Sequence, residues 1–229
     1  MRFRDRAQAG RALAARLCAH HEEGSLPGPL AVLALPRGGV PVADEVARAL
    51  DAPLDVLVAR KVGAPFQREL AVGALAGDDP PLFDERTLER LGLTPADLTA
   101  EVERERAELR RRTERYGRGR TAPELADRTV VVVDDGLATG ATARAALRSL
   151  RRRRPRHLTL AVPVCSRQAA RLLHEEATDL VALHQPEPFE AVGLWYQDFG
   201  QLTDDDVLRV LAEHDRRARR PAARAVPGD

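Results

Sequence analysis

The feature that most constrains the fold is a run of five residues, 129–133, with the sequence Thr-Val-Val-Val-Val. β-Branched side chains favour strands, and a short run without polar alternation is typical of a strand buried on both faces. Parallel strands of α/β proteins are buried in this way because helices cover both faces of their sheet. We therefore predict an α/β fold in which this segment is a buried parallel strand.

Other segments of the chain support the same fold class. Further strands are predicted over residues 30–35, 54–59, 157–162 and 179–183. Helices are predicted over residues 4–22, 40–50, 95–116, 139–152 and 166–175, with a last helix that starts at Thr203. Residues 62–81 are rich in glycine and proline and are predicted to form a loop with a weak hairpin at 70–76. Alternating strands and helices predict a mostly parallel, twisted sheet with helices on both faces.

Charged side chains are nearly balanced, with 36 lysines and arginines against 35 aspartates and glutamates. This balance argues against a general binder of nucleic acid or of a membrane surface. No stretch reaches the roughly 20 apolar residues of a membrane span, and no apolar signal core follows the charged N-terminus. The cysteines, Cys18 and Cys165, lack the spacing of metal ligands and are expected to be reduced thiols. We therefore expect a cytoplasmic protein.

Two adjacent acids, Asp134 and Asp135, follow the valine strand directly, and a loop of small residues follows them. Ligands of an open α/β sheet bind beyond the carboxyl ends of its strands. A loop that enters a helix presents free backbone N–H groups and the positive end of the helix dipole, which together favour a phosphate. Glycines allow close approach of the backbone and threonines add hydroxyl donors, here Gly136, Gly140, Thr139 and Thr142.

The acid pair needs partners, because neighbouring carboxylates repel each other. A vicinal diol supplies two hydroxyl donors, and a divalent cation offsets the charge. A phosphate on one side and a diol on the other describe ribose 5-phosphate. The segment is neither a Walker A loop nor a Gly-x-Gly-x-x-Gly fingerprint. The alternative, an ordinary turn capped by Asp and Thr, explains Thr139 but leaves the acid pair unexplained.

Residues 131–142 resemble the motif with which type I phosphoribosyltransferases bind 5-phosphoribosyl-1-pyrophosphate (PRPP). The resemblance implies a phosphoribosyltransferase-like core in which Asp134 and Asp135 bind the ribose hydroxyls and serve as ligands of Mg²⁺. It assigns the 5-phosphate to Gly136, Leu137, Ala138, Thr139, Gly140, Ala141 and Thr142.

A second motif, Pro36-Arg37-Gly38-Gly39, lies between a predicted strand and a predicted helix, where this family keeps its pyrophosphate loop. Gly38 and Gly39 would expose backbone donors, and Arg37 can bind phosphate oxygens with two N–H groups. An ordinary strand-to-helix turn is the alternative. Arg60-Lys61 resembles the Arg-Lys pair that several members place before a flexible lid.

Lys61 is the only lysine of the chain, and all the remaining lysine-or-arginine positions carry arginine. A surface position tolerates either residue, so this exception favours a site residue. We place it at the carboxyl end of the strand predicted over 54–59, at the same edge as Arg37 and Asp134. A compact ammonium suits a departing pyrophosphate better than the planar guanidinium does.

The resemblance spans roughly residues 3–213. Segments 63–65, 69–74 and 191–199 match a subgroup of predicted bacterial phosphoribosyltransferases. The resemblance implies one domain over residues 1–215, with a lid region at 62–120 and a small hood at 184–202. The tail 216–229 is rich in Arg, Ala and Pro and is expected to be disordered.

In purine-salvage members of the family, the hood stacks a base on an aromatic side chain. The hood of this chain offers Phe189, Trp195, Tyr196 and Phe199, of which we assign Trp195 to substrate binding. The alternative is that these rings only pack the C-terminal segment. Residues 163–166 lack the lysine that hypoxanthine-guanine enzymes use on the purine, which puts specificity for an oxopurine in doubt.

The resemblance implies an enzyme that displaces pyrophosphate from ribose C1 with a nitrogen nucleophile, such as that of a nucleobase. Lys61, Asp134 and Asp135 are the expected catalytic residues, and Mg²⁺ is the expected cofactor. The expected partners are PRPP, a small-molecule acceptor and a second copy of the chain in a homodimer. Two alternatives remain open. One is a PRPP-sensing regulator that uses an arginine patch on nucleic acid. The other is a hydrolase or phosphorylase of ribosyl phosphates.

Overall fold

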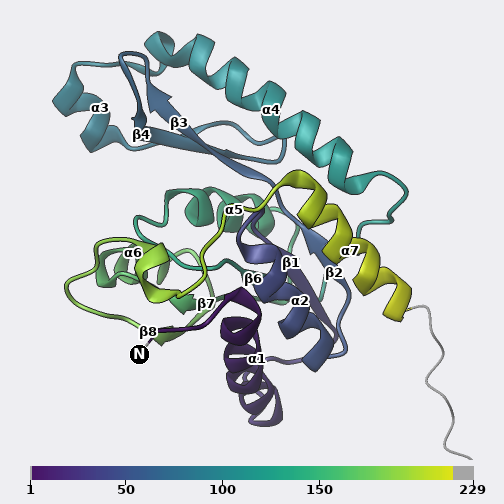
Figure 1. Ribbon diagram of the computed structural model, residues 1–229. Helices are drawn as coiled ribbons and strands as arrows, with labels where there is room; N and C mark the ends of the chain where they lie inside the picture. Colours follow the sequence, from purple (N-terminus) through teal and green to yellow (C-terminus); the bar gives the residue numbers. More distant parts are fainter. Residues whose placement is uncertain (1, 219–229) are drawn as a thin grey trace, which may run out of the picture.

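The computed structural model describes residues 2–218, and the helices, strands and contacts below refer to these residues. Its centre is a five-stranded sheet with the order β2-β1-β6-β7-β8, in which every neighbouring pair is parallel (Figure 1). The strands are β1 (Leu30–Ala34), β2 (Leu54–Val56), β6 (Thr129–Val133), β7 (His157–Val164) and β8 (Asp179–His184). The predicted α/β class with a mostly parallel sheet is confirmed.

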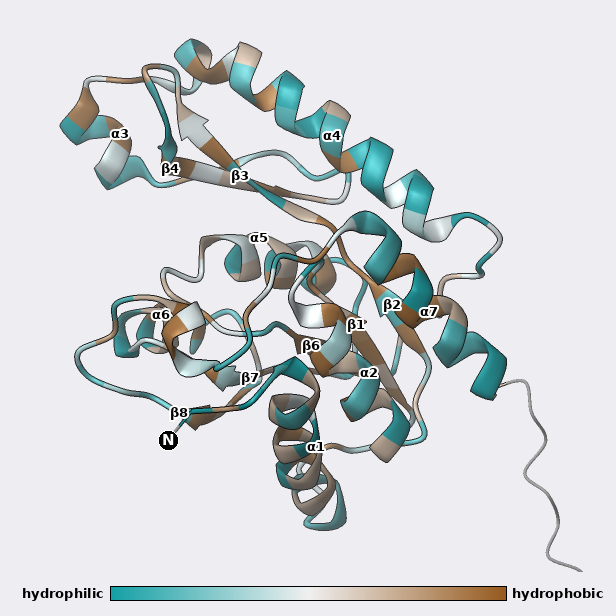
Figure 2. Cartoon of the chain, in the orientation of Figure 1, coloured by the Kyte–Doolittle hydropathy of each residue, from teal (hydrophilic) through white to brown (hydrophobic). Residues whose placement is uncertain are grey.

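Helices cover both faces of this sheet. One face packs against α1 (Arg6–Glu22), α2 (Gly39–Ala49) and α7 (Asp204–Ala218), and the other against α5 (Ala141–Arg151) and α6 (Arg167–Leu173). Successive residues of β6 alternate between the faces, because Val131 and Val133 contact the first group whereas Val130 and Val132 contact the second. Figure 2 shows β1 and β6 as hydrophobic along their length. The valine run is therefore buried on both faces, as its sequence predicts.

A second, antiparallel sheet with the order β3-β4-β5 lies beside the first, above it in Figure 1. Its strands are β3 (Ala59–Ala64), β4 (Gln67–Ala76) and β5 (Leu82–Phe83). They pack with α3 (Glu85–Leu91), the short 3₁₀ helix η1 (Pro95–Leu98) and α4 (Thr99–Gly117). Most of α4 is hydrophilic in Figure 2, and its buried side chains are Leu109 and Tyr116.

The prediction for residues 54–81 was wrong in two respects. The strand expected over 54–59 ends at Val56. The weak hairpin expected at 70–76 within a loop is a longer hairpin, formed by β3 and β4 over residues 59–76. Glycine marks close backbone approach here, because a Cβ on Gly63 would lie 2.2 Å from the Arg68 carbonyl oxygen. A Cβ on Gly73 would likewise lie 2.8 Å from the Leu82 carbonyl oxygen. These strands are rich in small residues, so they lack the alternation of large apolar and polar side chains that identifies a strand.

Other element boundaries also differ from the prediction. Helix α3 and strand β5 were not predicted, and the helix expected over 95–116 begins as the separate turn η1. The C-terminal helix α7 continues to Ala218, so residues 216–218 of the expected tail are helical. Arg217 contacts both Asp44 and Glu213, which gives this last turn partners. The remainder of the expected tail, 219–229, lies outside the described residues. Within the described part, no helix is long and apolar enough to cross a membrane.

A buried carboxylate joins α2 to α7. Asp44 on α2 lies 3.0 Å from His214 Nδ1, 3.4 Å from Arg48 Nε and 3.5 Å from an Arg217 guanidinium nitrogen. Burial acts to raise the pKa of Asp44, but the hydrogen bond with His214 and the charges of both arginines outweigh it and lower that pKa. The carboxylate therefore stabilises the folded chain above its ordinary pKa, and this contribution is lost as the pH falls through its folded pKa.

We expect Asp44→Asn to lower the free energy of unfolding by about 1–3 kcal/mol at pH 7, because it removes a charged hydrogen-bond acceptor from a buried site. The difference from the wild type should narrow below about pH 4, where the wild-type carboxylate also becomes protonated. Urea unfolding between pH 3 and pH 7 measures both effects. Asp205→Asn on the exposed start of α7 is the control, with an expected loss below about 1 kcal/mol. A difference that stayed constant down to pH 3 would contradict the role of Asp44.

Candidate active site

The loops that follow β1, β6 and β7 meet at the carboxyl edge of the parallel sheet. The backbone N–H of Leu35 donates to the Val133 carbonyl at 2.8 Å, which joins the first two loops. Leu137 N–H donates to the Val164 carbonyl at 2.9 Å, and Ser166 N–H donates to the Leu137 carbonyl at 2.8 Å. These bonds arise because parallel neighbours end at the same edge of the sheet. These hydrogen bonds hold the backbones of the three loops together as one cluster, which we call the loop cluster.

The glycine motif after β1 lies directly against the acid pair after β6. A Cβ on Gly38 would stand 1.9 Å from Asp135 Oδ2, and a Cβ on Gly39 would stand 2.9 Å from the Asp134 Cα. Neither distance is compatible with a side chain, so glycine at both positions permits the contact. The two sequence motifs, almost a hundred residues apart in the chain, are therefore in van der Waals contact.

The acid pair is partly buried. The side-chain oxygen Oδ1 of Asp134 accepts a hydrogen bond of 2.8 Å from the Asp135 backbone N–H. Burial raises the pKa of Asp134 well above its ordinary value, and the neighbouring charge of Asp135 adds to the effect. Burial also raises the pKa of Asp135, against the opposing influence of Arg6. Burial thus disfavours the charged form of both carboxylates, which a bound cation or diol would favour.

Arg6, which sequence reasoning did not identify, is the main partner of Asp135. Its Nε donates to Asp135 Oδ2 at 2.8 Å, and the two side chains are only 12% and 13% exposed. The Tyr196 hydroxyl donates to the Asp135 backbone carbonyl at 2.6 Å. The sequence carries no local signal of this contact, because Arg6 and Asp135 are 129 residues apart and Arg6 is one arginine among many.

The small-residue loop leads from the acid pair into α5. Ala138 and Thr139 are exposed, whereas Gly140 is buried and adopts φ = 76° as the residue before the helix. The Ser166 hydroxyl fixes the loop from behind by donating to the Ala138 carbonyl at 2.6 Å. The first backbone N–H groups of α5, with Ala141 and Thr142 in its opening turn, have no acceptor within the helix. An accessible loop at a helix N-terminus can receive a phosphate.

Only some of the predicted basic residues lie at this edge. Arg37 lies there, and its nearest acid is Asp204, at 3.8 Å. Arg60 instead forms hydrogen bonds of 2.6 and 2.9 Å with Glu105 on α4. Lys61 does not end a strand of the parallel sheet, contrary to the prediction, because it lies within β3, opposite Ala74 and exposed. The prediction failed because the chain leaves the parallel sheet after Val56.

The hood aromatics divide into two groups. Tyr196 stacks on Phe199 with ring centroids 5.0 Å apart and also contacts Phe3, so both hood rings pack against the N-terminal segment. Trp195 ends the 3₁₀ helix η2 (Val192–Trp195) and is half-buried. It borders a hollow of about 350 Å³ together with Arg2, Pro188, Glu190 and Leu194. For Tyr196 and Phe199, the structure favours the packing alternative.

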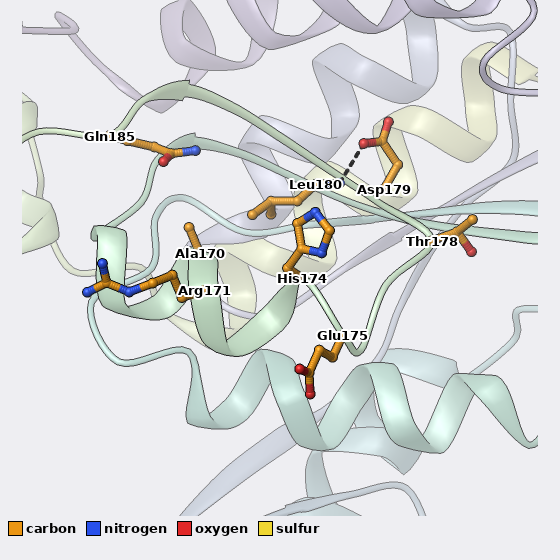
Figure 3. A pocket seen from close by; sticks show the side chains of 8 residues that line it. All are labelled: Ala170, Arg171, His174, Glu175, Thr178, Asp179, Leu180 and Gln185. Atoms are coloured by element: carbon orange, nitrogen blue, oxygen red, sulfur yellow. Dashed lines mark hydrogen bonds between the residues drawn. The ribbon is translucent and has the colours of Figure 1, made fainter.

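A larger hollow, of about 510 Å³, lies between α6 and β8 at the edge of the sheet (Figure 3). The side chains around it are Ala170, Arg171, His174, Glu175, Thr178, Asp179, Leu180 and Gln185. It contains none of the predicted site residues, and Thr178 and Asp179 stand at the amino end of β8, the end opposite the loop cluster. We therefore place the candidate site at the carboxyl edge and not here.

Replacing Gly38 by alanine should separate the glycine motif from Asp135, because the new methyl group would overlap the carboxylate. We expect Gly38→Ala to lower the free energy of unfolding by about 1–3 kcal/mol, as overpacked sites do. Chemical unfolding measures the change. Gly117→Ala is the matched control, because a Cβ there meets nothing within 4 Å and should leave stability unchanged or slightly raised. Equal stability of the Gly38 variant and the wild type would show that this contact is loose.

Comparison with known proteins agrees with this geometry. The family model of the phosphoribosyl transferase domain matches residues 5–194. A curated protein of Mycobacterium tuberculosis, named as a phosphoribosyl transferase in two strains, is 44% identical over 210 residues. The match covers 91% of this chain but 46% of that protein, so the chain spans about half the length of these relatives. The crystal structure of TT1426 from Thermus thermophilus is 46% identical, with a TM-score of 0.76 over 93% of this chain and 99% of that one. The family model matches most of the chain, and a solved structure of 46% identity shares its fold. The chain therefore belongs to the phosphoribosyltransferase family.

Proposed function

We propose that the protein binds PRPP at the carboxyl edge of its parallel sheet and transfers the 5-phosphoribosyl group to a nitrogen acceptor, such as a nucleobase, with release of pyrophosphate. The observation that carries this proposal is the contact of Gly38 and Gly39 with the pair Asp134 and Asp135. It puts a candidate pyrophosphate loop and a candidate ribose site side by side, as a ligand that joins pyrophosphate to ribose requires. Family membership supports the same activity.

The 5-phosphate is assigned to the loop from Gly136 to Thr142. Three observations support this assignment: the exposure of Ala138 and Thr139, the positive φ of Gly140, and the free N–H groups at the start of α5. The exposed Thr139 hydroxyl adds a further donor to the loop. The ribose hydroxyls then fall next to the acid pair, which precedes the loop.

The pyrophosphate is assigned to the loop from Arg37 to Gly39. Arg37 is partly exposed and only loosely paired, since its contact with Asp204 is 3.8 Å long. Asp204 is itself held by the Tyr116 hydroxyl at 2.7 Å and by Arg111 at 3.1 Å. Arg37 can therefore turn to phosphate oxygens without leaving Asp204 unpaired. Pyrophosphate that gathers charge as it leaves would be stabilised by this guanidinium and by nearby backbone donors.

The acid pair fits Mg²⁺ bound jointly with substrate. No three side chains of His, Cys, Asp or Glu gather to form a protein-only metal site in the described chain. Mg²⁺ prefers one or two carboxylates together with water and substrate phosphates, which matches the two acids present. Asp134 and Asp135 would hold the ion, although Arg6 already occupies Oδ2 of Asp135. When bound, the ion would supply charge that stabilises the leaving pyrophosphate.

The acceptor would approach from the hood, where Val192 lies against Gly136. A Cβ on Gly136 would stand 2.5 Å from Val192 Cγ1, so the hood touches the start of the phosphate loop. Trp195, which follows closely in the hood and is half-buried, remains the proposed stacking side chain. The protein contributes positioning and electrostatics, because the reaction needs no covalent intermediate on a side chain.

The activity is tested by mixing PRPP with single nitrogenous bases and measuring pyrophosphate release. Wild-type protein with Mg²⁺ should release pyrophosphate with at least one base, and both EDTA and Asp134→Asn should abolish the release. Titration calorimetry with PRPP should show the same dependence on the metal. Binding of PRPP without turnover on any base would point to a regulator. Equal affinity in EDTA would contradict the assignment of Mg²⁺ to the acid pair.

Loss of the Thr139 hydroxyl should weaken binding of the 5-phosphate. We expect Thr139→Ala to reduce the affinity for ribose 5-phosphate by about 1–3 kcal/mol, because a hydrogen bond to a charged group is lost. Thr121→Ala, at another exposed threonine remote from the loop in sequence, is the control and should bind normally. Calorimetry compares the two variants. The assignment fails if both bind ribose 5-phosphate as tightly as the wild type.

Lys61 remains a proposed catalytic residue although it lies on β3. Its side chain is exposed and has no hydrogen bond or ion pair to any of residues 2–218, so it is available to a ligand. Because arginine is larger and planar, Lys61→Arg should lower turnover at least about tenfold, or about 1.4 kcal/mol, with little change in thermal stability. Steady-state kinetics decide the matter. Wild-type turnover in the arginine variant would show that the single lysine is an accident of composition.

A further inference from the structure

The Arg6 side chain is much less exposed than those of the neighbouring arginines. Its side chain is 12% exposed, whereas those of Arg4 and Arg11 are 65% and 51% exposed. Burial of a guanidinium is unfavourable unless its donors are satisfied and its charge is balanced. Asp135 supplies the charge, and the Gly200 carbonyl accepts a second hydrogen bond at 3.0 Å.

The ring of Phe199 completes the surroundings of Arg6. The guanidinium carbon lies 3.9 Å from the centroid of this ring, which is a favourable distance for a cation–π contact. Phe199 is in turn held by its stacking on Tyr196. Arg6 is therefore fixed from three sides, by a carboxylate, a carbonyl oxygen and an aromatic ring.

The N-terminal segment and the hood form one unit around this arginine. Phe3 N–H donates to the Trp195 carbonyl at 2.8 Å, and Gln197 N–H donates to the Phe3 carbonyl at 2.8 Å. We call this unit, residues 3–6 with 195–200, the clasp. The clasp reaches Asp135 twice, through Arg6 at the side chain and through Tyr196 at the backbone carbonyl. The orientation of this carboxylate thus depends on segments near both ends of the described chain.

We propose that Arg6 is a positioning residue of the PRPP site. Because Arg6 binds Oδ2 of Asp135, it holds the carboxylate in one orientation. Oδ1 is then the oxygen that can accept a hydrogen bond from a ribose hydroxyl. It also links the acceptor-binding hood to the ribose site through the clasp. This inference rests on the proposed function, because it concerns the ribose of PRPP.

The test separates the ribose from the two phosphate groups. Calorimetry with Mg²⁺ is run with PRPP, with ribose 5-phosphate and with inorganic pyrophosphate. Arg6→Gln should weaken the binding of PRPP and of ribose 5-phosphate about tenfold or more, because Asp135 loses its fixed orientation. Binding of pyrophosphate, which has no ribose, should stay within about twofold of the wild type. Arg6→Lys should recover part of the lost affinity, because it restores the charge beside Asp135.

A matched control variant and a second variant near Arg6 distinguish a specific effect on binding from a general loss of folding. Arg11→Gln removes an arginine from the same helix, where it pairs with Glu45 at 3.0 Å, and should bind all three ligands normally. Phe199→Leu removes the ring below the guanidinium while leaving Arg6 in place, and should weaken PRPP binding in the same direction. In the double variant Arg6→Gln/Phe199→Leu, the two effects should be less than additive, because both act through Asp135.

The outcomes are distinguishable. Wild-type protein that fails to bind PRPP overturns the proposed function and this inference with it. Wild-type protein that binds PRPP, together with an Arg6→Gln variant that binds it equally well or more tightly, overturns the inference alone. Additive effects in the double variant also overturn it. Equal weakening of PRPP, ribose 5-phosphate and pyrophosphate by Arg6→Gln would show a loss of the whole site and would likewise contradict a role specific to the ribose.

Discussion

Two partly buried carboxylates that lie side by side at the end of β6 impose the main constraint on this structure. Asp134 and Asp135 are adjacent in the chain, so they cannot move apart, and burial strengthens their repulsion. The fold responds by bringing charge and hydrogen-bond donors to them. Helix α1 supplies the Arg6 guanidinium to the Asp135 carboxylate, and the Tyr196 hydroxyl donates to the backbone carbonyl of the same residue. Much of the tertiary arrangement around the carboxyl edge can be understood as the surroundings that these two groups require.

The parts that could be predicted from sequence are those with local causes. The valine run of β6 is identified by its side chains alone, and its boundaries match those predicted. The position of the glycine motif beside the acid pair also follows from local patterns, because parallel neighbours end at one edge of a sheet. Arg37 and the loop after Asp135 are therefore near each other for a reason that sequence reveals.

The parts that could not be predicted have causes distant in sequence. The partnership of Arg6 with Asp135 leaves no periodicity or motif in the first helix. In strands β3 and β4, Gly63 and Gly73 allow neighbouring backbone segments to approach closely. When only composition is considered, such glycines are typical of a flexible loop. Lys61 was misplaced for the same reason, since the end of β2 at Val56 depends on where the parallel sheet stops and the hairpin begins. Tertiary contacts decided these segments, and single-sequence patterns do not record such contacts.

The absence of a side chain at Gly38 has a consequence for divergence among related proteins. Any other residue at this position would occupy space that Asp135 already fills. Gly38 can therefore change only where Asp135 has been replaced or has moved, whereas a smaller residue in place of Asp135 would fit beside an unchanged Gly38. A side chain larger than glycine at this position of a related chain would therefore imply that its loop has moved away from the acids.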